Sequence, residues 1–70
     1  MQETDKLRVL IPHWIEHNRE HAAEFRDWAE RAGEAAPEIL AAADVVIQAN
    51  ASLDAALEKL GGPLDYQHAH

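Results

Sequence analysis

Apolar residues recur along this chain at intervals of three and four, the spacing of one face of an α-helix. The pattern fills two stretches, residues 12–32 and 37–60, and each carries proline only at its first position, where a helix tolerates it. Gly33 can adopt the left-handed conformation that ends a helix, and Gly61, Gly62 and Pro63 end the second stretch. The sequence therefore predicts an all-α chain: two helices, a turn at 33–36 and an irregular tail at 61–70.

The segment before Pro12 allows two conformations. Thr4 can cap a helical turn through residues 5–10, so that Pro12 kinks one continuous helix. Alternatively, residues 6–11 run extended into the helix that starts at Pro12. We favour the kinked helix.

Each predicted helix contains one set of positions that repeats alternately every three and four residues, as in nearly parallel helices with interlocked side chains. In the first helix these positions are Ile11, Trp14, Asn18, His21, Phe25, Trp28 and Ala32. In the second helix they are Ile39, Ala43, Val46, Asn50, Leu53, Leu57 and Leu60. We expect the two sets to face each other in an antiparallel two-helix hairpin, with Asn18, His21 and Asn50 forming one polar layer.

A second apolar stripe flanks this expected interface. Its members are Ile15, Ala22, Ala29, Leu40 and Ile47. A lone hairpin would leave the stripe in water, at about 25 cal/mol for each Å² of apolar surface. We therefore expect a homodimer in which two hairpins form a four-helix bundle.

Composition narrows the function classes. The chain has 70 residues, no cysteine, and 13 acidic against 6 basic side chains, giving a formal net charge of −7. So short a chain forms one domain, and without disulfides it needs a metal or oligomerisation for stability. The acidic charge disfavours nucleic acid and anionic lipid as partners. No stretch of 18 uninterrupted apolar residues is present, so we expect a cytoplasmic protein that does not enter a membrane.

Three histidines, His13, His17 and His21, follow one another at intervals of four residues and lie in a row along one flank of the first predicted helix. Glu20 and Glu24 each follow a histidine by three positions. Imidazole nitrogen and carboxylate oxygen are ligands of zinc, nickel, cobalt and copper(II). The row is a candidate site for one of these divalent metals, although a solvated helix face gives the same spacing.

Two more histidines, His68 and His70, close the chain. In an antiparallel hairpin the end of the second helix lies beside the start of the first, so these residues can join the candidate metal site. A disordered tail is the alternative.

No enzymatic arrangement accompanies the histidines. In His13-Trp14-Ile15-Glu16-His17 the glutamate precedes the second histidine, whereas the zinc peptidase motif places it after the first. The Glu-x-x-His repeat of ferritin-like di-iron proteins is also missing. We therefore expect a protein that is not an enzyme.

The stretch from Ile11 to His21, followed by Phe25 and Trp28, resembles small uncharacterised prokaryotic helical domains with a Pro-His-Trp-x-x-His-Asn-x-x-His signature. The Leu-Gly-Gly-Pro-Leu ending at residues 60–64 is similar as well. This resemblance implies a small helical domain and no particular activity. The hairpin pattern is also similar to dimeric helical hairpins that regulate plasmid copy number by binding RNA, a function that the acidic charge disfavours.

The sequence leaves two main functional hypotheses. The first is a non-enzymatic homodimer that holds a divalent transition metal for storage, sensing or delivery. The second is a protein-protein interaction or structural module whose histidines are solvated. A smaller alternative is pH sensing by His21, if that imidazole lies between the helices.

Overall fold

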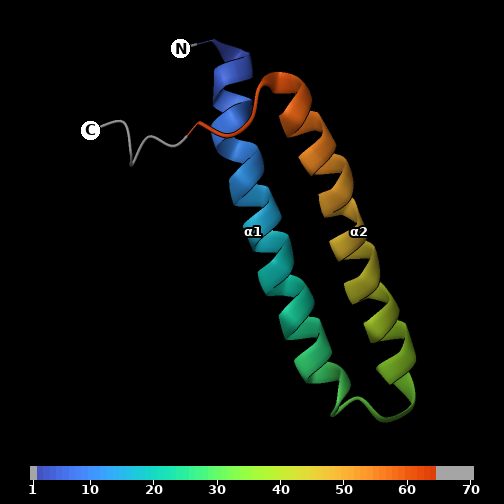
Figure 1. Cartoon of the computed structure of the whole chain (residues 1–70). Coiled ribbons are helices and arrows are strands. Elements are labelled where there is room, and N and C mark those ends of the chain that lie inside the picture. The colour runs from blue at the N-terminus through green and yellow to red at the C-terminus, as the bar shows by residue number, and fades with distance from the viewer. Residues whose placement is uncertain (1, 65–70) are drawn as a thin grey trace.

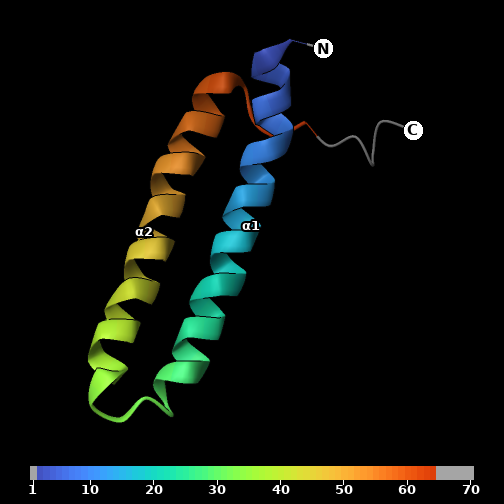
Figure 2. The ribbon, with the colours of Figure 1, turned by 180° about the vertical axis from the view of Figure 1, so that it is seen from behind.

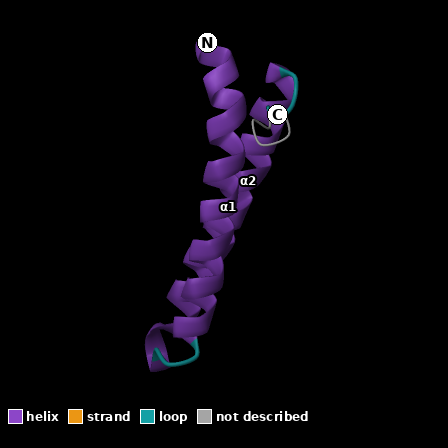
Figure 3. Cartoon of the chain, turned by 90° about the vertical axis from the view of Figure 1, so that its left-hand side faces the viewer, coloured by secondary structure: helices purple, strands orange, loops and turns teal. Residues whose placement is uncertain are grey.

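Two long antiparallel helices make up the described part of the chain, residues 2–64 of the computed structural model. Helix α1 spans Glu3–Ala29, the short 3₁₀ helix η1 spans Gly33–Ala35, and helix α2 spans Ala36–Leu60. The two long helices lie side by side (Figures 1 and 2). Seen edge-on, they overlap in a single layer (Figure 3). This arrangement confirms the predicted all-α hairpin, while His68 and His70 lie outside the described residues.

Helix α1 begins earlier and ends earlier than the predicted boundaries of 12 and 32. It starts at Glu3, with Gln2 rather than Thr4 preceding the first turn, and it continues through Pro12. Acidic residues Glu3 and Asp5 lie in the first turn, where their negative charges interact favourably with the positive end of the helix dipole. At the other end, the Arg31 N–H donates to the Trp28 carbonyl and the Ala32 N–H to the Ala29 carbonyl, so the chain tightens into a turn.

The turn and helix α2 agree closely with the sequence pattern. Gly33 has φ +57°, the left-handed conformation that glycine adopts without a steric penalty. Helix α2 begins at Ala36 with Pro37 in its first turn and ends at Leu60. Gly61 follows with φ +109°, its N–H donates to the Glu58 carbonyl, and the Gly62 N–H donates to the Leu57 carbonyl. These two bonds form a Schellman motif, which satisfies carbonyls at the end of the helix.

The contact between the helices is made by small and medium apolar side chains around one polar pair. Buried residues of α1 are Ile11, Ile15, Ala22 and Ala29, and those of α2 are Ala43, Asn50 and Leu57. The Asn18 Nδ2 donates to the Asn50 Oδ1 at 2.9 Å, and the Asn50 Nδ2 donates to the Ile15 carbonyl at 3.2 Å. The predicted interface positions of α2 are thus confirmed, and Asn18 and Asn50 belong to one polar layer as expected.

The predicted interface positions of α1 are wrong in part. Trp14 and Trp28 are 43% and 57% exposed, and His21 is exposed too, so it is absent from the polar layer. Ile15, Ala22 and Ala29, which were expected to face a second copy, instead lie between α1 and α2. The physical reason is size: alanines at 22, 29 and 43 let the two backbones approach closely, and indole rings do not fit between helices at that distance.

Arg8 joins the end of α2 to α1. Its Nε donates to the Gly62 carbonyl at 2.6 Å and its Nη2 to the Gly61 carbonyl at 3.0 Å. The Leu64 N–H in turn donates to the Arg8 carbonyl at 3.2 Å. We call this set of three hydrogen bonds the Arg8 clasp.

Residues Gly33–Leu60 have the length and apolar composition of a helix able to cross a membrane, although only 11% of the tested window is buried in the hairpin. A core helix of a soluble protein passes the same test. The finding establishes that α2 has apolar surface that α1 does not cover.

Candidate metal centre on helix α1

The three histidines of α1 lie in one exposed row. The ring centroids of His13 and His17 are 6.3 Å apart, and those of His17 and His21 are 6.4 Å apart. Phe25 extends the row, with its ring centroid 6.4 Å from that of His21. Neighbouring rings are inclined by only 31–32°, because four residues bring the helix slightly more than one full turn round.

A glutamate lies beside each of two histidines. The Nδ1 of His17 is 3.9 Å from the Glu20 Oε1, and the Nδ1 of His21 is 3.7 Å from the Glu24 Oε1. All four side chains are more than half exposed. Each carboxylate therefore faces one ring nitrogen and leaves the other, Nε2, available to a ligand.

The row does not form a complete metal site within one hairpin. Across residues 2–64, no three histidine, aspartate or glutamate side chains come together closely enough to hold an ion. Two imidazoles on one zinc ion, with Zn–N distances of about 2.0 Å, have ring centroids roughly 5 Å apart. Adjacent centroids in the row are 6.3 and 6.4 Å apart, so a pair could share one ion only after its side chains rotate toward each other, and one protomer would then supply two nitrogens.

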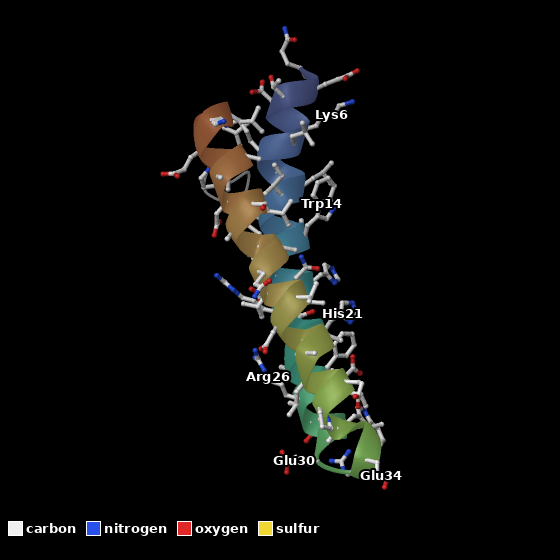
Figure 4. All side chains as sticks on the ribbon, turned by 90° about the vertical axis from the view of Figure 1, so that its right-hand side faces the viewer. Lys6, Trp14, His21, Arg26, Glu30 and Glu34 are labelled. Carbon is white, nitrogen blue, oxygen red and sulfur yellow. The ribbon has the colours of Figure 1, made fainter. Side chains whose placement is uncertain are left out.

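The two broad sides of the hairpin differ in chemistry. On one side, the Arg26 Nη2 lies 3.7 Å from the Asp44 Oδ1 across the two helices. Figure 4 shows Trp14 and His21 on the opposite side from Arg26. That opposite side also carries α2 residues that lie one position before, or three positions after, a buried residue of the helix.

We call this second side the apolar face. From helical spacing, we assign to it Leu10, Trp14, His17, His21, Phe25 and Trp28 of α1 and Ala42, Val46, Ala49, Leu53 and Ala56 of α2. The indoles of Trp14 and Trp28 alone expose on the order of 200 Å². Exposed apolar patches of this kind mark contact surfaces, and sequence reasoning missed the role of the tryptophans because it assigned them to the hairpin interface.

The chain belongs to the family described as Domain of unknown function (DUF8180), whose model matches residues 7–60. The matched segment begins in α1 and ends with α2, so it contains the complete histidine row. This finding agrees with the resemblance to uncharacterised small domains. No curated protein and no solved structure matches the chain.

Proposed function

We propose that this DUF8180 domain is a non-enzymatic protein that binds a divalent transition metal, zinc, nickel, copper(II) or cobalt, through His13, His17 and His21. The observation that supports the proposal is the exposed row itself, in which neighbouring imidazoles lie one helical turn apart. Two histidines at this spacing on a helix can bind one zinc ion.

Glu20 and Glu24 support the same chemistry in a second way. A histidine that binds a metal through one nitrogen commonly has a carboxylate at the other, which fixes the ring and increases its basicity. His17 and His21 already have a glutamate oxygen beside Nδ1. Both glutamates therefore fit an outer position, and rotation of either side chain can also make it a direct ligand.

Titration calorimetry of metal-stripped, tag-free protein with Zn²⁺, Ni²⁺, Cu²⁺ and Co²⁺ tests the proposal. We expect binding of at least one ion with a Kd below about 10 μM, and loss of most of that affinity when all three row histidines become alanine. Gln48→Ala, an exposed change on α2, is the matched control and should leave the affinity unchanged. Failure of every metal to bind at that level contradicts the proposal.

A second candidate function is protein-protein interaction, and the exposed tryptophans of the apolar face favour it. In that case metal binding is absent and the histidines are solvated. Thermal melting separates the two functions. A metal that binds only the folded state raises Tm, by an amount that grows with the logarithm of its concentration divided by Kd. If the histidines are solvated and bind no metal, Tm is the same with and without added metal.

A further inference from the structure

We infer that a second copy of this chain packs on the apolar face about a two-fold axis, bringing His17 and His21 of both copies into one shared metal site. The inference rests on the proposed function for the identity of the ligand. Zinc takes four ligands, and one hairpin would supply two histidine nitrogens, so two copies together would supply all four.

The first argument is that most of the α1 part of the apolar face repeats symmetrically about residue 19. Leu10 and Trp28 lie nine positions on either side, and His17 and His21 lie two positions on either side. The other two members, Trp14 and Phe25, have no counterpart within the face and lie opposite positions 24 and 13 of the second copy. An antiparallel α1 of a second copy therefore places Trp28 of the partner subunit opposite Leu10. It also places His21 of the partner subunit opposite His17, as an isologous interface requires.

The three alanines that helix α2 contributes have the same symmetry at the same height. Ala42 and Ala56 lie seven positions on either side of Ala49, so one alanine meets another across the axis. Within the hairpin, the Asn18–Asn50 hydrogen bond of 2.9 Å places residue 19 level with residue 49. A single axis therefore relates both helices, with bulky side chains packing between the α1 pair and alanines between the α2 pair.

The available area is close to the lower end for a specific dimer. The apolar face runs from residue 10 to residue 28, about 27 Å along the helix, and two helices side by side are about 20 Å wide. The face thus covers about 500 Å² per copy in projection, compared with about 600 Å² per partner in the smallest interfaces of standard size. Glu20 and Glu24 border the face beside His17 and His21, and in a shared site a divalent cation would offset the negative charge that they bring to the interface.

Sedimentation analysis of the full chain, with and without Zn²⁺, tests the dimer. We expect a particle of twice 7.8 kDa, and at least a hundredfold weaker association for Trp28→Glu. Leu40→Glu is the matched control because Leu40 is 44% exposed but lies on the other side of the hairpin, one turn before Asp44. A monomeric wild-type chain, equal effects of both variants, or insertion into phosphatidylcholine vesicles in place of self-association overturns the inference.

Zinc titration of single histidine variants tests the shared site. Two copies that share one site bind one zinc ion per two chains, and His17→Ala and His21→Ala each weaken binding about tenfold or more while His13→Ala has little effect. In a site confined to one protomer, His17→Ala alone has the largest effect, since His17 belongs to both adjacent pairs, and one ion binds per chain. That second result overturns the shared site but leaves metal binding intact, whereas absence of zinc, nickel, copper and cobalt binding overturns both.

Discussion

Two asparagines carry most of the specificity of the contact between the helices. Asn50 is only 6% exposed, and its side chain uses both its oxygen and its nitrogen, the first with Asn18 and the second with the Ile15 carbonyl. A buried amide that is fully paired fixes the alignment of two helices, because sliding by one turn would leave it unpaired. The sequence predicts that both asparagines lie in one polar layer, because each interrupts an otherwise apolar set.

Replacing one asparagine should therefore cost more than replacing both. We expect Asn18→Leu to lower the free energy of unfolding by about 1–3 kcal/mol, because it leaves the Asn50 Oδ1 without its donor. The double variant Asn18→Leu and Asn50→Leu should recover part of this loss. Urea unfolding measures both, with Gln48→Ala as the exposed amide control, and a single variant as stable as the wild type would contradict the expectation.

His21 shows where sequence reasoning fails at the scale of one residue. On α1, two apolar stripes overlap, one with tryptophans and the other with Ile15, Ala22 and Ala29. Large aromatic side chains are usually core residues, so the sequence pattern favours burial of the first stripe. The choice between the stripes depends on the distance between the helix axes, which the alanines of both helices set jointly. The exposed position of His21 removes the premise of the pH-sensing hypothesis, which required burial.

At the scale of the helices, Pro12 has a role that its position in the sequence does not reveal. Proline has no N–H, so within α1 the Arg8 carbonyl lacks the donor four residues later. The Leu64 N–H, arriving from the end of α2, takes that place at 3.2 Å. The helix defect therefore creates the acceptor that anchors the segment after Gly62.

We expect Pro12→Ala to separate these two effects. Alanine restores a donor to the helix and is about 3 kcal/mol more favourable than proline in a helix interior, so the free energy of unfolding should rise by about 1–2 kcal/mol. The Leu64 amide should meanwhile exchange with solvent about tenfold faster, because its acceptor is taken. Hydrogen exchange followed by NMR measures the rate. Pro63→Ala is the control, because it removes a proline without adding a donor within α1 that competes for the Arg8 carbonyl. Unchanged protection of Leu64 would refute the proposed role.

Helix positions were largely predictable because glycine and proline mark them so clearly. Gly33 and Gly61 adopt positive φ angles that few other residues tolerate, and Pro37 lies in the first turn of α2. All three lie where the sequence predicts a helix end or start. The first nine residues of α1 were harder to assign, since they lack a capping side chain and precede an internal proline. Arg8 in this segment contacts Gly61 and Gly62, residues more than fifty positions away that local sequence patterns do not connect to it.

The whole molecule is a single layer whose two broad sides have different chemistry. The side with the Arg26–Asp44 ion pair is charged, whereas the apolar face carries the tryptophans and the histidine row. Sequence reasoning predicted an uncovered apolar surface and a second copy to cover it. Of the residues assigned to that surface, Leu40 is exposed as expected, whereas Ile15, Ala22 and Ala29 are buried within the hairpin.

The Arg8 clasp has a consequence for the order in which the chain folds. Contacts between the helices join residues 18 positions apart at Arg26 and Asp44, 32 at Asn18 and Asn50, and 54 at Arg8 and Gly62. Because closing a longer loop costs more chain entropy, we expect pairing to start beside Gly33 and to progress along the rod, with the clasp forming last.

Opening of the native state should follow the reverse path. We expect amides of α2 after Asn50 to exchange through partial openings of lower free energy than those between Pro37 and Asn50, as measured by native-state hydrogen exchange. Uniform protection along α2 would contradict this order. Formation of the Arg8 hydrogen bonds would then be the last step of folding, and their loss the first step of opening.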